Sequence, residues 1–318
     1  MPALIPSSNL AFSRKGPLVS LPEAEDTKDP CPVFDGKTWH IFGSGGSSST
    51  ETWAILHATA PTIEGPWEIE EHATLYGVSG PHAVAPGVLY DAGKFHMFLQ
   101  TDYSALGSKI EYLVSDDGHS FYHVNTALEP LPGTNEAGIY DPHPAIIDGK
   151  KYFVYSGFPR VGHGDIYLAK SSGSSWGGPW NRLGAILTHE DVPYHNQHEN
   201  PDYEWGLEGA QLAQLPSGVI VLTAVCFLPE GKRGSRQRVF LALASNILGP
   251  YKHVGPVLNP GSEDWESGEN GHATTLIDKD NMRIFYQGRA MNGHWKYGLA
   301  EAKTEEIEAL ASKILTGS

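Results

Sequence analysis

The chain has 318 residues, of which 40% are hydrophobic, and a formal net charge of -15. It is long enough for one large or two ordinary domains with a sizeable core, while its negative charge argues against binding nucleic acid or an anionic membrane surface. No run of 18 apolar residues occurs, so no helical membrane span is predicted. The abundant glycine (36) and proline (23) favour short strands joined by tight turns.

The first residues, "MPALIPSSNLAFSRKG", contain no continuous apolar segment behind a basic start. We therefore predict no signal peptide, and expect a cytoplasmic protein or an exported one from which the signal has been removed. Two cysteines, Cys31 and Cys226, are too few for a disulfide framework and are predicted to be buried free thiols.

One pattern occurs five times: a special residue, an apolar run, a turn and an apolar-aromatic strand. Successive copies begin 56, 56, 67 and 63 residues apart. The copies are "DPCPVFDGKTWHIFGSG" from Asp29, "APGVLYDAGKFHMFLQTD" from Ala85, "DPHPAIIDGKKYFVYSG" from Asp141, "EGAQLAQLPSGVIVLTAV" from Glu208 and "GHATTLIDKDNMRIFYQG" from Gly271. A Gly-Pro-aromatic step before an outer strand closes several units, as in "EGPWEI" (64–69) and "GGPWNRL" (177–183).

Five units of three or four antiparallel strands predict an all-β, five-bladed β-propeller over residues 21–303. A β-sandwich or two barrels is the alternative, but five equivalent units fit it less well. Residues 1–20 are predicted to form an N-terminal arm or the strand that closes the ring. The segment 304–318 contains "TEEIEALASKIL", whose acidic start and one-sided apolar residues predict a short C-terminal helix.

The first strand of each propeller blade lines the central axis, so the residues that open the five units should meet at one mouth. Asp29, Asp141, Glu208 and His272 are then brought together with the Ala85-Pro86 step. A stable fold does not need three carboxylates and an imidazole at one place, because they shift one another's pKa values. Two separated carboxylates, one protonated and one ionised, are what glycoside hydrolysis requires.

The order of these dipeptides resembles glycoside hydrolase family 43 and its propeller relatives, over about residues 25–303. Those proteins have Asp-Pro, Ala-Pro, Asp-Pro, Glu-Gly and Gly-His steps in successive blades. The resemblance implies that Asp29 is the general base, Glu208 the general acid, and Asp141 the aspartate that orients the acid and adjusts its acidity. It also implies that His272 holds a calcium ion or an ordered water on the axis, with no organic cofactor. Three departures affect the substrate surround. Ala210 stands where the family commonly has proline, Gly87 follows the Ala-Pro step where an aspartate is common, and Val84 precedes it where an aromatic residue is common.

Substrate-binding candidates come from the segments around these positions. Tyr203 and Trp205, just before Glu208, can stack on sugar faces. Phe158 and Arg160 follow the inner hairpin of the third unit, and Arg289 follows that of the fifth, where relatives often place a sugar-binding arginine. A core aromatic or a surface charge is an equally good interpretation of each.

Simpler interpretations exist for several other features. Asp29 and Asp141 also suit turns, and His272 is as well explained by a structural hydrogen bond as by a metal. The histidines at 189, 195 and 198 match no strong zinc spacing, and "GSGGSSS" (43–49) is interpreted as a flexible loop.

The leading hypothesis is an inverting glycosidase that cleaves α-L-arabinofuranosides or β-D-xylosides in an oligosaccharide or glycoside substrate. A retaining, fructosidase-like enzyme on the same fold is the first alternative, and a non-catalytic carbohydrate-binding propeller is the second, because a fold alone does not establish function.

Overall fold

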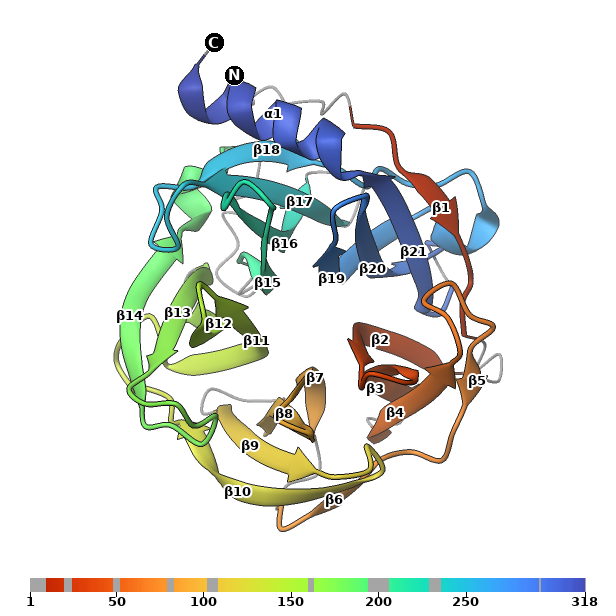
Figure 1. Cartoon of the computed structure of the whole chain (residues 1–318), viewed down its shortest axis with the longest axis vertical. Coiled ribbons are helices and arrows are strands. Elements are labelled where there is room, and N and C mark those ends of the chain that lie inside the picture. The colour runs from red at the N-terminus through yellow and green to blue at the C-terminus, as the bar shows by residue number, and fades with distance from the viewer. Residues whose placement is uncertain are drawn as a thin grey trace.

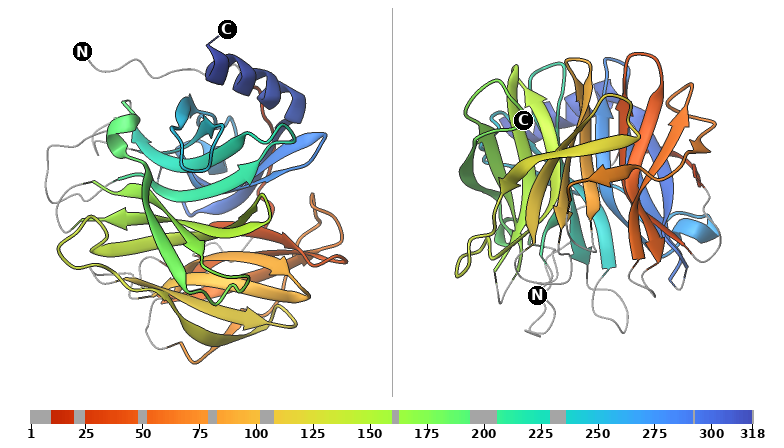
Figure 2. Two further views of the ribbon diagram at one scale, coloured as in Figure 1. Left: turned by 60° about the vertical axis from the view of Figure 1, so that its left-hand side comes forward. Right: turned by 90° about the horizontal axis from the view of Figure 1, so that it is seen from below.

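The computed structural model describes residues 10–19, 25–47, 52–78, 83–101, 108–159, 163–193, 206–228, 236–291 and 293–317. Five blades surround a central axis in Figure 1, which confirms the predicted five-bladed propeller. Their strands pair antiparallel, except for one short outer strand of the second blade, which pairs parallel. The edge-on view in Figure 2 (right) shows the strands running roughly along this axis. No helix in the described ranges is long and apolar enough to cross a membrane.

Each blade is built from strands that follow one another from the axis outward, apart from one extra strand in blade II and one early strand in blade V. Blade I contains β2 (Asp26–Phe34), β3 (Trp39–Ser47), β4 (Thr52–Ala60) and β5 (Glu68–Ile69). Blade II contains β7 (Val84–Asp91), β8 (Lys94–Thr101), β9 (Lys109–Ser115), β10 (Ser120–Leu128) and β6 (Thr74–Tyr76). Blade III contains β11 (Gly138–Ile147), β12 (Lys150–Phe158), β13 (Asp165–Ser171) and β14 (Trp180–Leu187). Blade IV contains β15 (Glu208–Gln214), β16 (Ile220–Leu228), β17 (Arg236–Ala244) and β18 (Lys252–Pro256). Blade V contains β19 (Glu269–Ile277), β20 (Asn281–Arg289), β21 (Lys296–Lys303) and β1 (Ser13–Lys15).

The two ends of the chain both meet blade V. Strand β1 pairs antiparallel with β21, so a segment near the N-terminus supplies the outermost strand of the last blade. Helix α1 (Thr304–Thr316) follows β21 and packs Ile307 and Ala311 against the apolar side chains of blades IV and V. Short 3₁₀ turns lie at His189–Asp191 (η1) and Asp264–Glu266 (η2).

Hydrophobic side chains fill the interfaces between neighbouring blades. Five buried clusters of described residues occur, one at each interface, and each draws from both adjoining sheets. Phe42 and Phe95, for example, join blades I and II, and Leu168 and Phe240 join blades III and IV. Each buried large side chain stabilises the fold by about 1.5–3 kcal/mol, so the ring is held together around its circumference while its centre stays open to polar groups.

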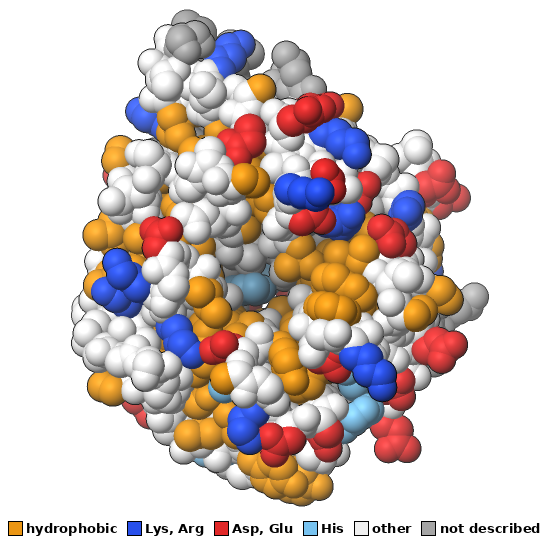
Figure 3. All heavy atoms as spheres, viewed as in Figure 1, with side chains coloured by type: hydrophobic (Ala, Val, Ile, Leu, Met, Phe, Trp, Pro, Cys, Tyr) orange, Lys and Arg blue, Asp and Glu red, His pale blue; other side chains and the backbone are white. Residues whose placement is uncertain are grey.

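The surface shows no large basic area on the face drawn in Figure 3, where lysines and arginines alternate with acidic and apolar side chains. The same face is hollowed at the centre of the ring. Both predicted free cysteines, Cys31 and Cys226, are buried and unpaired by any disulfide.

Candidate active site

All five inner strands carry the same irregularity where they begin. The pairing register shifts between residues 28 and 31, 84 and 87, 140 and 143, 208 and 211, and 271 and 274. Each shift contains one residue with positive φ. These residues are Asp29 (φ 58°), Ala85 (52°), Asp141 (51°), Gly209 (58°) and His272 (32°). Only glycine adopts this region freely, and other residues pay about 1–2 kcal/mol for it, so four of the five positions store backbone strain.

The strained backbone is held by side chains from the preceding blade. The N–H of Asp29 donates to Gln287 Oε1 (2.9 Å), that of Asp141 to Gln100 Oε1 (2.8 Å), and that of Ala85 to Ser44 Oγ (2.8 Å). The bulge thus removes these donors from the strand ladder without leaving them unsatisfied.

Blade IV differs from the sequence-based match by one residue. Its positive-φ position is Gly209, and Glu208 lies immediately before it. Glu208 was matched to the two aspartates, but its side chain leaves the strand one position earlier. Its side chain still lines the same pocket as the two aspartates. The N–H of Gly209 donates to Asp141 Oδ2 at 3.1 Å, which joins blades III and IV at this point.

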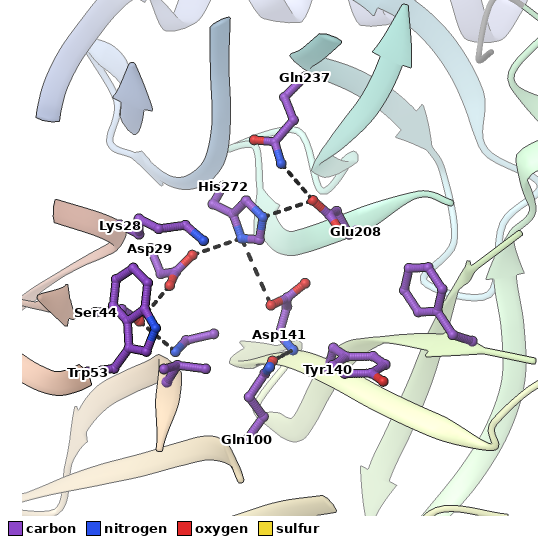
Figure 4. Close-up of a pocket in the computed structure, with 13 residues that line it drawn as sticks. Lys28, Asp29, Ser44, Trp53, Gln100, Tyr140, Asp141, Glu208, Gln237 and His272 are labelled. Carbon is purple, nitrogen blue, oxygen red and sulfur yellow. Dashed lines mark hydrogen bonds and ion pairs between the residues drawn. The ribbon is translucent and has the colours of Figure 1, made fainter. Parts of the chain in front are cut away.

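The mouth is a pocket of about 350 Å³, a volume typical of small-ligand sites. Its described lining contains the predicted Asp29, Asp141, Glu208, His272 and Phe158. Ala85 of the predicted Ala-Pro step also lines the pocket. The lining residues that were not predicted are Lys28, Ser44, Trp53, Val84, Gln100, Tyr140 and Gln237. Figure 4 shows these side chains converging from all five blades.

His272 lies at the centre of the acidic groups (Figure 4). Its Nδ1 is 2.9 Å from Asp29 Oδ1 and 3.9 Å from Asp141 Oδ1, while its Nε2 is 3.1 Å from Glu208 Oε1. Burial lowers the pKa of His272, but the charges of Asp141 and Asp29 and the hydrogen bonds to Asp29 and Glu208 raise it well above 6.5. The imidazole is therefore a cation whose Nε2–H donates to Glu208 and whose Nδ1 forms an ion pair with Asp29.

The two aspartates have opposite ionisation behaviour. Burial raises the pKa of Asp29, but the nearby His272 and Lys28 cations and the Ser44 hydroxyl (2.6 Å from Oδ2) lower it to about 2. Burial also raises the pKa of Asp141, and there the charges of Glu208 and Asp29 add to the effect of burial, so the pKa rises to about 6. Glu208 is the most exposed of the three carboxylates, at 21% against 11% and 12%, so it is the best placed to meet a ligand.

The predicted calcium ion can be tested against the donor set. One ligand atom from each of Asp141, Glu208 and His272 lies within 4.8 Å of the others, which is close enough for a shared ion. Calcium prefers oxygen ligands, however, and both nitrogens of His272 already face carboxylates and carry hydrogens. An ion at His272 would have to displace one of these hydrogens and its carboxylate contact. The ion remains a prediction.

The remaining substrate-binding candidates divide into two groups. Arg289 is not among the described pocket-lining residues; its guanidinium contacts Glu269 at 2.5–2.7 Å and lies 4.4 Å from the centre of the Trp295 ring. Arg160, Tyr203 and Trp205 lie outside the described residues.

Two sequence signals for the missed residues existed. Lys28 and Tyr140 directly precede the two Asp-Pro steps, and Gln100 directly follows the apolar pair Phe98-Leu99. Gln237 lies between Arg236 and Arg238, so no such signal marked it. The interpretation of residues 43–49 as a flexible loop was wrong for its first part, because 43–47 belong to β3. Glycine is required there by close packing: a Cβ on Gly43 would collide with the Tyr297 hydroxyl, which donates to the carbonyl of Lys28.

Comparison with known proteins finds no matching family model and no match among curated proteins. Solved structures do match. The catalytic domain of the Coprinopsis cinerea GH62 α-L-arabinofuranosidase has a TM-score of 0.69 and 19% identity, covering 94% of this chain and 98% of that one. An exo-1,5-α-L-arabinanase from a bovine ruminal metagenomic library has a TM-score of 0.64 and 14% identity, covering 89% and 95%. The endo-arabinase of Bacteroides thetaiotaomicron VPI-5482 has a TM-score of 0.63 and 16% identity, covering 87% and 94%. A thermostable family-43 glycoside hydrolase has a TM-score of 0.65 and 17% identity, covering 87% and 88%. This chain therefore shares its five-bladed propeller fold with these glycoside hydrolases.

Proposed function

We propose that this chain is an inverting glycoside hydrolase, with Asp29 as general base and Glu208 as general acid. The observation that carries the proposal is the placement of Asp29 and Glu208 on different nitrogens of one imidazole, at the edge of a sugar-sized pocket. The N–H bonds of an imidazole diverge, so the ring keeps the two carboxylates apart. Inverting enzymes separate the two carboxylates by about 6.5–9.5 Å to admit water beside the sugar, and retaining enzymes by about 5–5.5 Å; we expect the separation of Asp29 and Glu208 to fall in the longer range.

Each of the two carboxyl groups transfers one proton in the reaction: Asp29 accepts one and Glu208 donates one. Asp29, whose pKa is lowered to about 2, is ionised at neutral pH and accepts a proton from a water molecule. The water oxygen forms a bond to the anomeric carbon as the bond from that carbon to the leaving oxygen breaks. Glu208 donates its proton to the leaving oxygen, and Asp141 and His272 orient the two groups through the contacts described above.

The substrate class is proposed from the names of the structural relatives, which are an α-L-arabinofuranosidase and two arabinanases. We therefore place α-L-arabinofuranosides first, β-D-xylosides second, and an oligosaccharide or glycoside as the partner. Trp53, Tyr140 and Phe158 supply aromatic surface in the pocket, which suits the apolar faces of a sugar ring.

A panel of nitrophenyl glycosides tests the activity, with wild type compared with Asp29→Ala and Glu208→Ala. We expect the wild type to cleave the α-L-arabinofuranoside and both variants to lose most of that activity. A wild type that cleaves nothing but binds sugars would favour the non-catalytic propeller. An NMR assay of the first anomer released then separates the mechanisms: inversion supports the proposal, and retention would make Asp29 a nucleophile.

A further inference from the structure

The amide of Gln237 contacts the proposed acid from β17, the third strand of the same blade (Figure 4). Its backbone is held on both sides: its N–H faces Glu269 Oε1 at 3.4 Å, and its carbonyl accepts a hydrogen bond from Arg238 Nη1 at 2.7 Å. Arg238 is itself buried and also donates to the carbonyl of Gly268. The side chain therefore starts from a fixed position beside the pocket.

Two donors converge on one oxygen of Glu208. Gln237 Nε2 lies 2.9 Å from Oε1, and His272 Nε2 lies 3.1 Å from the same atom. Within the described ranges no donor contacts Oε2 of Glu208. An oxygen that accepts two N–H bonds cannot also carry the carboxyl hydrogen with good geometry, so the transferable proton is directed to Oε2.

The orientation of the amide is also determined by its surroundings. If the amide were reversed, its oxygen would face Glu208 Oε1 and two acceptors would meet. In the observed orientation the Gln237 oxygen is buried, makes no hydrogen bond to the described residues, and lies against Gly271. A Cβ on Gly271 would collide with this oxygen, so the absence of a side chain at 271 makes room for the amide.

We propose that Gln237 is a positioning residue that holds Glu208 Oε1 and keeps the transferable proton on Oε2, facing the leaving group. This inference rests on the proposed glycosidase function. Gln237 acts through Glu208, so its loss should impair proton donation and leave sugar binding intact.

Two leaving groups separate this role from a general structural one. A 2,4-dinitrophenyl α-L-arabinofuranoside departs without protonation, whereas a methyl or sugar leaving group needs the acid. General acid catalysis contributes about 10²–10⁴-fold, and we expect Gln237→Met, which has a similar length but no donor, to lose about 30-fold or more in kcat on the methyl glycoside. On the dinitrophenyl substrate we expect a loss of less than about threefold, with KM unchanged within about twofold on both.

A second variant and two references complete the experiment. Gly271→Ala keeps the amide but displaces it, and should show the same selective loss if it keeps the wild-type melting temperature. Gln214→Met, at the far end of β15 and outside the pocket, should match wild type on both substrates. Glu208→Gln removes the acid itself and should therefore show the largest loss of kcat on the methyl glycoside relative to the dinitrophenyl substrate.

Equal losses on the two substrates, or no loss in Gln237→Met, would overturn the role of Gln237. A wild type inactive on both substrates, or a fully active Glu208→Gln, would instead overturn the proposed function, and the inference with it.

Discussion

Asp29 and Asp141 begin the same Asp-Pro-x-Pro motif in blades I and III, and their backbones are nearly identical, with φ of 58° and 51°. Their ionisation is opposite: the pKa of Asp29 is lowered to about 2, and that of Asp141 is raised to about 6. Because both side chains are almost equally buried, burial alone does not account for the difference.

The difference arises from the side chains around each aspartate, both in its own blade and in the neighbouring blades. Asp29 lies 2.9 Å from the His272 cation and accepts a hydrogen bond from Ser44. Asp141 lies 3.9 Å from the same ring, accepts from one backbone N–H, and is near the charges of Glu208 and Asp29. The repeat therefore determines where each aspartate lies, and the residues that do not repeat determine its charge.

The largest expected effect comes from Asp29→Asn. Without a base to accept the proton from water, kcat should fall by about 10³-fold or more, measured as initial rates on an α-L-arabinofuranoside. Asp148→Asn, at the hairpin turn of blade III, is the matched control and should keep wild-type activity. A variant that keeps more than a tenth of the wild-type rate contradicts the assignment of Asp29.

Asp141→Asn should give a smaller loss in kcat, about 10²-fold. Its effect on the stability of the fold should be opposite to that of Asp29→Asn. A lowered pKa means that ionised Asp29 stabilises the fold above pH 4, and this contribution is lost as the pH falls toward 2. A raised pKa means that ionisation of Asp141 destabilises the fold increasingly as the pH rises from about 4 to 6.

At pH 7.5 the melting temperature should therefore rise in Asp141→Asn and fall in Asp29→Asn, each by roughly 2 °C or more for a change of about 1–2 kcal/mol. Thermal unfolding of the two variants beside wild type measures this. Shifts of the same sign would show that the two aspartates do not differ in the way described.

Ser44→Ala tests one contact that Asp29 has and Asp141 lacks. The variant removes a donor to Asp29 Oδ2 and the acceptor of the Ala85 N–H. A hydrogen bond to a charged group contributes about 1.5–3 kcal/mol, so we expect kcat/KM to fall by about tenfold. The pH at which activity is half lost on the acidic side should move upward, and an unchanged pH profile would exclude Ser44 from this role.

Two buried histidines extend the comparison. His272 faces carboxylates and its pKa is raised, whereas burial and the neighbouring His40 and His119 lower the pKa of His57 to about 3. His57 is neutral in the fold but protonates in the unfolded chain below about pH 6.5, so stability should fall with decreasing pH by up to about 1.4 kcal/mol per pH unit. In denaturant unfolding between pH 6.5 and 4, His57→Gln should show a shallower slope than wild type; equal slopes would contradict a neutral His57.

The five blades and the positions of Asp29, Asp141 and His272 follow from local pattern. Asp-Pro, Ala-Pro and Gly-His steps stand immediately before apolar runs, and a repeat of about 60 residues makes their strands equivalent. The helix at Thr304–Thr316 also follows from local pattern, because its acidic first turn and its apolar spacing are contained within one segment, although its N-terminus has no side-chain cap.

The supporting residues could not be predicted in the same way, because each acts on a residue that is distant in the sequence. Gln100 belongs to blade II but holds Asp141 of blade III, and Gln237 reaches Glu208 from the third strand of blade IV. The one-residue offset at Glu208 was not predicted either. The positive-φ residue of blade IV is Gly209, and the order of apolar residues does not show at which residue the bulge lies. Arg289 was predicted to bind sugar by analogy with relatives. In the structure its guanidinium forms an ion pair with Glu269 and lies over the Trp295 ring.

The central claim is that one motif places two aspartates alike and that their surroundings give them opposite ionisation. Carbon-13 NMR of the side-chain carboxyl groups tests it directly, with the two signals assigned by their loss in Asp29→Asn and Asp141→Asn. We predict that the Asp141 signal titrates near pH 6 while the Asp29 signal stays at its ionised position down to pH 4. Two signals that titrate together, or an Asp29 that protonates at higher pH than Asp141, would contradict the account.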